Sequence, residues 1–293
     1  MTNDSARRGT PADDETAPKV SRRTFLATTG AGLATAAAAT TSASAASGQT
    51  EKKAAAPRAV ALTGQMTEYK SGDLMIPAYV ARPADIKRKK APAVLVIHEV
   101  FGLNDHIKSI ADRIAGAGYV AIAPNFFARA ADPPKDMSNV DAIRKAASSI
   151  PPEAANRDMQ AALDFIKRDK RVLPRLASVG FCMGGGFSYR LAAYTEDLAG
   201  AVIFYGRTPL ELVPQIKCPL LANFGETDTG IPPAKVQEWV DALNKAGKSV
   251  DAKIYPGAGH GFFNDTGQRY NAAAAADAWQ RTLKFFREKL DKK

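Results

Sequence analysis

The sequence predicts an α/β fold in which helices cover both faces of a mostly parallel sheet. Short apolar runs rich in β-branched residues, such as residues 93–98 (AVLVIH), alternate along the chain with segments of helical periodicity. A continuous apolar run of this kind is typical of a parallel strand that is buried on both sides. Strands that alternate with helices favour a parallel sheet, because each helix carries the chain back to the edge where the next strand starts. The chain has 293 residues, which is enough for one large domain of this class.

The expected elements follow one another from residue 76 to residue 290. Strands are expected at 76–81, 93–98, 119–123, 176–180, 200–204, 219–224 and 250–255, and helices at 107–117, 152–168, from the glycine-rich segment to 194, 234–246 and 272–290. Gly118 closes the first helix, and Pro151 and Pro152 stand where a helix start tolerates proline. No internal repeat or composition shift divides residues 59–293, so they are predicted to form one domain. Residues 46–58 are polar and rich in Ala and Lys, which indicates a linker.

Residues 1–45 are predicted to be an export signal outside the fold. The pair Arg22–Arg23 precedes a weakly apolar run and then a small-residue cleavage site, ASA at 43–45. This pattern resembles a twin-arginine signal, so the twin-arginine export machinery is an expected partner, with a periplasmic or extracellular destination. The run has only Phe25, Leu26 and Leu33 as large apolar residues, so no stable membrane anchor is expected. A disordered low-complexity tail is the alternative.

The net charge of +10 does not by itself indicate a nucleic-acid partner. The cations are scattered, and the one dense run, Lys87–Lys90 (KRKK), is typical of a solvated loop. No basic helix with interleaved aromatic residues is present, so no nucleic acid is expected to bind.

A cysteine stands between glycines at residues 180–185 (GFCMGG), after a predicted strand and before a predicted helix. This is the G-x-nucleophile-x-G form, which in an α/β-hydrolase fold makes a sharp strand–turn–helix elbow. The glycines leave room for the turn, and the side chain of Cys182 is then held out above the sheet. The positive potential at the start of the following helix favours a thiolate. The alternative is that Cys182 is a small buried residue and that the glycines serve only close packing.

A cysteine nucleophile requires a base, and the base requires an acid that orients it. Asp228 follows the predicted strand 219–224, and His260, the only histidine after the elbow, follows the strand 250–255. The carboxyl ends of parallel strands share one edge of a sheet, so these side chains are expected to converge on Cys182. The order nucleophile, acid, histidine is that of α/β-hydrolases. Glu226 is a rival for the acid, and Asp228 could instead be a turn residue.

The two cysteines, Cys182 and Cys218, are not expected to form a disulfide. One ends a predicted strand and the other begins one, and parallel strands of about five residues separate such ends by roughly 16 Å. A disulfide requires Cα atoms within about 7 Å. Cys218 is therefore expected to be buried and unreactive.

Four segments in order, HEVFG at 98–102, GFCMGGG, GETDTGIP and AGHGF, resemble the dienelactone hydrolase family, the carboxymethylenebutenolidases. The resemblance runs from about residue 60 to the end of the chain. It implies an α/β-hydrolase fold and a small-molecule lactone or ester substrate. It also implies hydrolysis through Cys182, His260 and Asp228, by way of an acyl-enzyme.

The resemblance gives Glu99 a role as well. The matching family glutamate holds the resting thiol until substrate frees the sulfur to pair with the histidine, and a carboxylate does disfavour a neighbouring thiolate. Capping of the following helix is the alternative for Glu99. The fold's geometry together with the resemblance assigns the oxyanion hole to the backbone N–H groups of Met183 and Val100.

Substrate-binding residues follow from the resemblance less completely. Arg129 matches a family arginine that binds the substrate carboxylate, and its forked guanidinium suits that role. His98 and Tyr205 are expected to line the pocket, with ordinary packing as an equal alternative for Tyr205. The family's second arginine, shortly after the histidine, is absent: Asn264 stands at its place, with Arg269 nearby.

No metal is expected, because His98-Glu99 lacks the second histidine of an H-E-x-x-H motif, and the chemistry needs no organic cofactor. Three other functions stay open. One is a broader carboxylesterase or thioesterase with the same triad, and another is a non-catalytic binding protein that kept the fold. The third is a thiol redox protein, which the chain's lack of a C-x-x-C motif disfavours.

Overall fold

The computed structural model of the chain describes residues 63–87, 89–133 and 139–291. The predicted export signal at 1–45 and the predicted linker at 46–58 lie outside the described residues. Within those ranges, no helix is both long enough and apolar enough to cross a bilayer.

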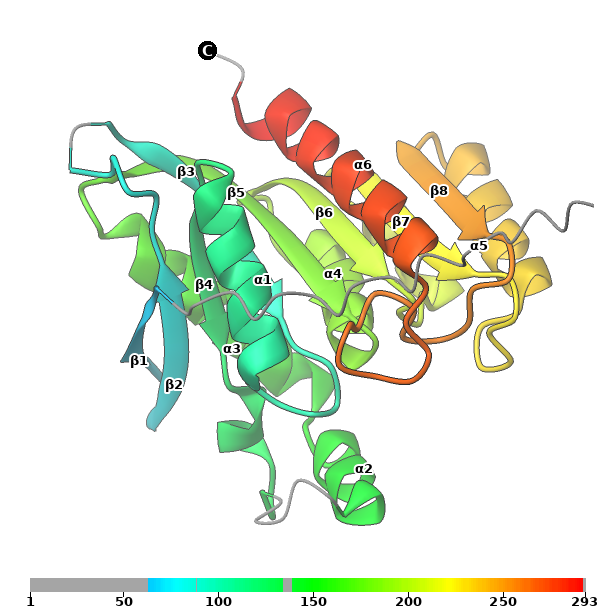
Figure 1. The fold of residues 1–293 in the computed structure, drawn as a ribbon, viewed down its shortest axis with the longest axis horizontal. Helices are drawn as coiled ribbons and strands as arrows, with labels where there is room; N and C mark the ends of the chain where they lie inside the picture. The colour runs from blue at the N-terminus through cyan, green and yellow to red at the C-terminus, as the bar shows by residue number, and fades with distance from the viewer. Residues whose placement is uncertain (1–62, 88, 134–138, 292–293) are drawn as a thin grey trace, which may run out of the picture. The chain divides into compact units, whose positions relative to one another are not determined.

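An eight-stranded sheet forms the centre of the described domain (Figure 1). Its strands lie in the order β1-β2-β4-β3-β5-β6-β7-β8. β2 pairs with β1 and with β4 in antiparallel orientation, and all other pairs are parallel. The mostly parallel sheet predicted from the sequence is therefore confirmed. The strands are β1 (Gln65–Ser71), β2 (Leu74–Ala81), β3 (Ala91–Ile97), β4 (Val120–Pro124), β5 (Val172–Phe181), β6 (Leu198–Phe204), β7 (Leu220–Gly225) and β8 (Val250–Tyr255).

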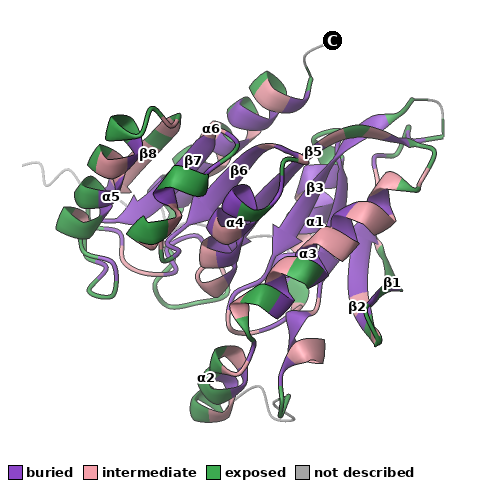
Figure 2. Ribbon diagram, turned by 180° about the vertical axis from the view of Figure 1, so that it is seen from behind, coloured by how far each residue is buried: buried purple, intermediate pink, exposed green. Residues whose placement is uncertain are grey.

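Helices cover both faces of this sheet, α1 and α6 on one side and α3, α4 and α5 on the other (Figures 1 and 2). Successive side chains of β3 enter opposite cores: Leu95 and Ile97 pack with the helices on one face, Val94 and Val96 with those on the other. Both faces are thus buried, which explains the uninterrupted apolar run. The helical elements are α1 (Asp105–Gly116), η1 (Phe126–Arg129), α2 (Val140–Ser148), α3 (Pro152–Lys167), α4 (Met183–Tyr194), η2 (Leu210–Gln215), α5 (Pro233–Lys245) and α6 (Ala272–Leu290).

Besides the short η1 and η2, one strand and one helix were not expected from the sequence. β1 is an edge strand whose residues are largely exposed, so it lacks an apolar run; its buried Tyr69 donates a hydrogen bond to the carbonyl of Asp158 at 2.9 Å. α2 lies between the predicted strand 119–123 and the predicted helix 152–168, where neither a helix nor a strand was expected. It buries only Ile143 and Ala146, and the side chain of Asn139 caps its start.

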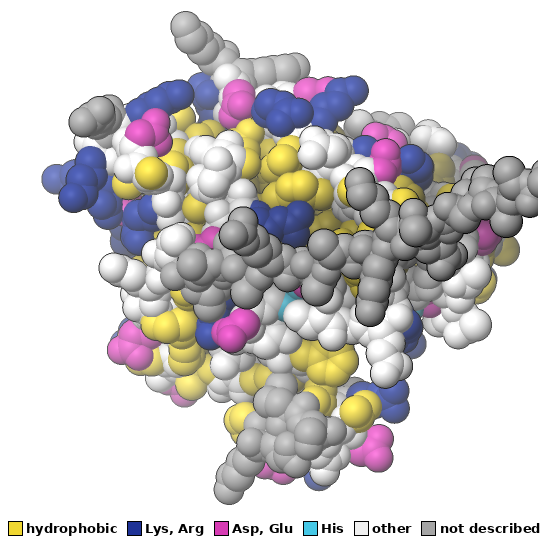
Figure 3. Space-filling view, viewed as in Figure 1, with side chains coloured by type: hydrophobic (Ala, Val, Ile, Leu, Met, Phe, Trp, Pro, Cys, Tyr) yellow, Lys and Arg dark blue, Asp and Glu magenta, His cyan; other side chains and the backbone are white. Residues whose placement is uncertain are grey.

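Charged side chains are spread over the domain surface. On the face drawn in Figure 3, Lys and Arg (dark blue) lie in several separate places with Asp and Glu (magenta) among them. Some of these charges are paired, as between Lys253 and Asp277 at 2.8 Å. The surface seen in this view therefore matches the scattered charge pattern of the sequence.

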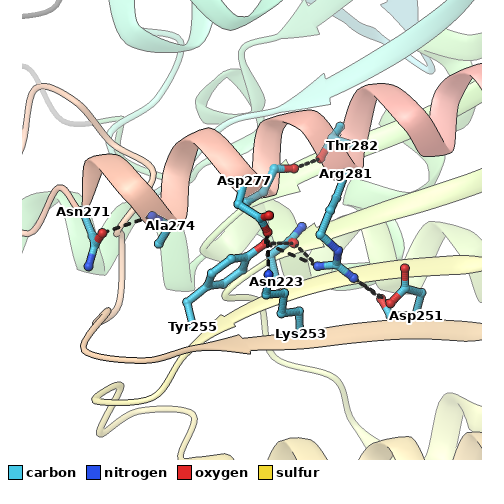
Figure 4. Close-up of polar contacts among 10 residues, drawn as sticks. Asn223, Asp251, Lys253, Tyr255, Asn271, Ala274, Asp277, Arg281 and Thr282 are labelled. Atoms are coloured by element: carbon cyan, nitrogen blue, oxygen red, sulfur yellow. Dashed lines mark hydrogen bonds and ion pairs between the residues drawn. The ribbon is translucent and has the colours of Figure 1, made fainter.

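A polar network holds β7 and β8 against α6 (Figure 4). Arg281 of α6 donates hydrogen bonds to Asn223 on β7, at 2.7 Å, and to Asp251 on β8, at 2.6 Å. Tyr255, at the end of β8, donates to Asp277 of α6 at 2.8 Å. The two strand ends that lead into the loops of the predicted acid and histidine are therefore fixed by one helix.

Candidate active site

Cys182 occupies a strained turn between β5 and α4. Its φ of 55° and ψ of −115° lie in a region that residues other than glycine rarely adopt. The glycines around it allow the turn: a Cβ on Gly180 would overlap the carbonyl of Gly184, and a Cβ on Gly184 would overlap the carbonyl of Ile97. The strand–turn–helix geometry predicted for GFCMG is present.

The cysteine, histidine and aspartate predicted to converge do lie together. Nε2 of His260 is 3.1 Å from Sγ of Cys182, and Nδ1 of His260 is 2.8 Å from Oδ2 of Asp228. A carboxylate only accepts hydrogen bonds, so Nδ1 carries the proton and Nε2 can accept the proton of the thiol. The second oxygen of Asp228 accepts from the backbone N–H groups of Gly230, at 2.8 Å, and Ile231, at 3.1 Å. The carboxylate is buried and fixed on both sides.

The thiol of Cys182 is protonated at neutral pH, because burial and, to a smaller extent, the charge of Glu99 raise its pKa to about 11. The backbone N–H groups of Met183 and Val100 bond to the sulfur and lower the pKa. These two groups act in the direction expected at a helix start, but burial outweighs them. Burial therefore sets the net direction of the pKa shift in the resting site, while the contribution expected from the helix start still favours the thiolate.

Glu99 lies buried beside the thiol, but its hydrogen bonds go elsewhere. Oε1 accepts from the hydroxyl of Tyr205 at 3.2 Å, and Oε2 accepts from Nδ2 of Asn264 at 2.6 Å. The thiol instead pairs with His260. Asn104, not Glu99, caps α1, since its side chain accepts the N–H of Ile107. Glu99 is thus a buried carboxylate that acts on the sulfur through its charge.

Tyr205 and Asn264 complete the surroundings of Glu99. Tyr205 is fully buried with a φ of 38°, and its ring centre lies 5.1 Å from that of His260. Asn264, at the place of the family's second arginine, is the donor to Glu99. This contact could not be predicted from the sequence, since 165 residues separate the two along the chain. His98 does not line the cavity beside Cys182, so that expectation is wrong; it is neutral, because burial lowers its pKa to about 4, and it bonds only to backbone groups.

The structure places Arg129 away from the thiol. Its guanidinium forms a two-pronged pair with Asp158 of α3, with Nε to Oδ2 at 3.0 Å and Nη2 to Oδ1 at 2.8 Å. The side chain of Asp158 is fully buried and also accepts from the hydroxyl of Ser71 at 2.6 Å. Arg129 does not line the cavity beside Cys182. Its donors are therefore engaged by a structural partner that the sequence resemblance did not reveal.

Replacing Arg129 by methionine is expected to lower the free energy of unfolding by about 3 kcal/mol, because it leaves the buried carboxylate of Asp158 without its counter-charge. Urea unfolding measures this loss. The KM for a carboxylate-bearing lactone should stay unchanged. A large rise in KM with unaltered stability would instead restore Arg129 to the substrate site.

A cavity of about 890 Å³ opens over the thiol. Cys182 and His260 line it, together with Met183, Val100 and Tyr205. In the part of the chain that the structure describes, no group of three or more His, Cys, Asp or Glu side chains could hold a metal ion.

Replacing Glu99 by glutamine is expected to lower the pKa of Cys182 from about 11, because the negative charge that opposes thiolate formation is removed. A shift of about one pKa unit would speed alkylation at pH 8 about tenfold. The pH dependence of iodoacetamide labelling measures it. Substitution of the exposed Glu226 by glutamine is the matched control. A Cys182 pKa in the Glu99→Gln variant that equals or exceeds the Cys182 pKa in the control would contradict the electrostatic role of Glu99.

The fold and the sequence both have known relatives. The model of the dienelactone hydrolase family matches residues 76–290. A protein of Saccharolobus solfataricus named "Putative carboxymethylenebutenolidase" is 36% identical over 254 residues, covering 75% of this chain and 96% of its own. A protein of the same name from Escherichia coli K12 is 32% identical over 245 residues, covering 80% and 90%.

Among solved structures, one titled "Putative Dienelactone Hydrolase", from Klebsiella pneumoniae, superposes with a TM-score of 0.73 at 30% identity. The superposition covers 78% of this chain and 99% of that one. The shared fold is that of α/β-hydrolases. The match to the family model spans most of the chain and includes Cys182, Asp228 and His260. The chain belongs to the dienelactone hydrolase family of carboxymethylenebutenolidase-like hydrolases.

Proposed function

We propose that the chain hydrolyses lactones or esters through a covalent intermediate on Cys182. The observation that carries the proposal is the unbroken series of hydrogen bonds from Sγ of Cys182 through His260 to Asp228, at the wall of an 890 Å³ cavity. An activated nucleophile requires a base within hydrogen-bond reach and a third group that orients the base.

In the first half-reaction, Sγ attacks the substrate carbonyl carbon while its proton passes to Nε2 of His260. The carbonyl oxygen becomes negative and accepts hydrogen bonds from the N–H groups of Met183 and Val100, which bond to the sulfur in the resting site. The C–O bond then breaks, and the proton on Nε2 goes to the departing alkoxide. For a lactone, the alcohol so formed stays attached to the acyl group.

In the second half-reaction, water replaces the leaving group and loses a proton to Nε2 of His260. The resulting hydroxide attacks the thioester carbonyl, the C–S bond breaks, and the proton returns to the sulfur. Asp228 holds the imidazole in the tautomer that both steps need. Burial and, to a smaller extent, the charge of Glu99 keep the resting thiol protonated, so that the nucleophile forms only as substrate accepts its charge.

The substrate class rests on the family relatives, whose printed names are those of carboxymethylenebutenolidases. A broader carboxylesterase is the second candidate. The observation that favours it is the cavity, whose volume of about 890 Å³ lies toward the upper end of small-molecule sites.

Intact-mass measurement after rapid mixing with dienelactone or p-nitrophenyl acetate, followed by an acid quench, tests the proposal. The expected result is turnover together with one acyl adduct, carried by the peptide that contains Cys182. The peptide with Cys218, the second free cysteine, serves as the internal control and should stay unmodified. Turnover that persists after Cys182 has been fully alkylated would contradict the mechanism, and absence of any hydrolysis would favour a binding or redox role.

We also propose that residues 1–45 direct the protein through the twin-arginine export machinery, on the strength of the Arg22–Arg23 pair and the ASA segment at 43–45. Fusion of these residues to a reporter that is active only after export tests this. The double change Arg22→Lys and Arg23→Lys should keep the reporter inside the cell. Unchanged export by the double variant would contradict it.

A further inference from the structure

The cavity above Cys182 extends away from the sulfur along one face of α4. Met183, Gly186, Phe187 and Arg190 line it. Residues spaced by three, four and seven positions lie on the same face of a helix, so these four form a continuous stripe. At a rise of about 1.5 Å per residue, the stripe runs about 11 Å from Met183 to Arg190. The cavity therefore offers a path two helical turns long, which starts at the sulfur.

The loop after β6 forms a second wall of the same path. Arg207 and Pro209 of this loop line the cavity, as does Leu210, the first residue of η2. A Cβ added to Gly186 would lie 3.3 Å from the carbonyl oxygen of Arg207, so this loop runs directly beside the first turn of α4. Phe187, between Met183 and Arg190 on the stripe, makes the path apolar there, and Leu210 also lines the cavity.

The cavity lining is basic, and Arg190 stands at the far end of the stripe. Four cations line the cavity, Arg144, Arg190, Arg207 and Lys235, against one acid, Glu238. Glu238 is engaged by Lys235 at 2.7 Å, and Arg144 lies 3.9 Å from Asp141 of its own helix.

Arg190 and Arg207 differ from the other two cations. Among the described residues, neither forms an ion pair or a side-chain hydrogen bond, although Arg190 is half-buried on α4. A guanidinium group presents a fork of donors that matches an anionic oxygen pair. Arg129, by contrast, is already occupied by Asp158. Within the described ranges of the chain, the unpaired guanidinium groups that line this cavity are thus those of Arg190, which is half-buried, and Arg207, which is exposed.

We propose that the substrate is an extended ester whose acyl chain ends in an anionic group bound by Arg190 and Arg207, with an apolar spacer between that group and the reacting carbonyl. This inference rests on the proposed function. The acyl group is assigned to the path because it remains on the sulfur, where the stripe begins, while the leaving alcohol must lie beside Nε2 of His260 to take its proton. Such a substrate is longer than a small lactone, and its anion lies about two helical turns from the carbonyl.

A chain-length series of p-nitrophenyl esters tests the proposal. The p-nitrophenyl monoesters of succinic, adipic and suberic acids are compared with neutral p-nitrophenyl alkanoates of the same carbon number. The ratio of kcat/KM for the charged over the neutral ester is expected to rise about tenfold to a hundredfold from succinate to suberate, because only the longer chains reach the guanidinium groups.

Substitutions at the two arginines separate this site from general charge effects. Arg190→Gln and Arg207→Gln are each expected to reduce the suberate ratio to that of succinate, and Arg190→Lys to retain part of it. The matched control is Arg287→Gln on α6, an exposed arginine outside the cavity, which should keep the full ratio. A ratio that stays flat with chain length, or that Arg190→Gln and Arg207→Gln leave unaltered, would overturn the proposal while neutral-ester hydrolysis still supports the proposed function.

A binding measurement stands apart from catalysis. Titration calorimetry of the Cys182→Ala protein with octanoate, octyl phosphate and octanol is expected to show binding of the anions and not of the alcohol, and loss of anion binding in the Cys182→Ala, Arg190→Gln double variant. The stronger of the two anions identifies carboxylate or phosphate as the terminal group. Equal binding of octanol, or anion binding that survives the double substitution, would overturn the inference even if no ester proved to be a substrate.

Discussion

Replacing Cys182 by alanine is expected to abolish ester hydrolysis, with kcat falling by a factor on the order of 10⁶, as for loss of a protease nucleophile. In the proposed mechanism the sulfur supplies the electron pair that forms the covalent intermediate, and no other nucleophilic side chain lies at hydrogen-bond distance from His260 among the described residues. Steady-state turnover of p-nitrophenyl esters, with burst amplitude as a second readout, measures the loss. The fold should survive, because alanine is smaller than cysteine and the strained backbone is held by its neighbours.

Cys218→Ala is the matched control for this experiment. Cys218 is the other free cysteine, buried near the start of β7 and outside the cavity. Its substitution should leave kcat within a factor of about two of the unaltered protein. A small loss of side-chain volume far from the active site acts mainly on stability. A Cys182→Ala protein that keeps a hundredth or more of the activity would place the nucleophile elsewhere.

The central strands could be predicted from the sequence because a strand that is buried on both faces needs an uninterrupted run of apolar residues. The run at 93–98 coincides with β3 to within two residues at each end, and 250–255 is β8. β1 was not predicted because it is an edge strand that faces water and needs no uninterrupted apolar run. α2 was not predicted because its nine residues have only two buried positions, and this periodicity is too weak to distinguish a short helix from a loop.

The meeting of Cys182, Asp228 and His260 could be predicted because parallel strands end at one edge, so residue type and position after a strand were sufficient. Contacts between distant segments left no such local trace. Asp158, the partner of Arg129, lies on α3, 29 residues away along the chain. The match of Arg129 to a family arginine did not indicate this partner.

The net shift of the thiol pKa could not be predicted from the sequence either. Helix polarity is readable from the order of strand and helix, but the depth of burial is a property of the folded cavity, and it sets the net shift of the Cys182 pKa. The same holds for the free guanidinium groups of Arg190 and Arg207, since the absence of a partner is visible only once all neighbours are placed.

Asp228→Asn is expected to lower kcat/KM by about 10⁴, although asparagine has nearly the same shape. Oδ1 of Asp228 accepts two backbone N–H groups, from Gly230 and Ile231, so the amide oxygen of asparagine must take that position. The amide NH₂ then faces Nδ1 of His260, which can no longer donate and becomes the acceptor. The proton moves to Nε2, and the imidazole loses the lone pair that accepts the thiol proton. Kinetics with a neutral p-nitrophenyl ester measure the loss, and circular dichroism checks the fold.

Glu226→Gln is the matched control, because Glu226 is the other acid in the same turn. It is exposed, and its Oε2 accepts from the N–H of Gly257 at 2.8 Å instead of meeting the imidazole. Its substitution is expected to leave kcat/KM unchanged, since the tautomer of His260 does not depend on it. A loss of activity in Glu226→Gln, with Asp228→Asn fully active, would show that Glu226 and not Asp228 orients His260. The ring of His260 would then have to turn away from its 2.8 Å contact with Asp228.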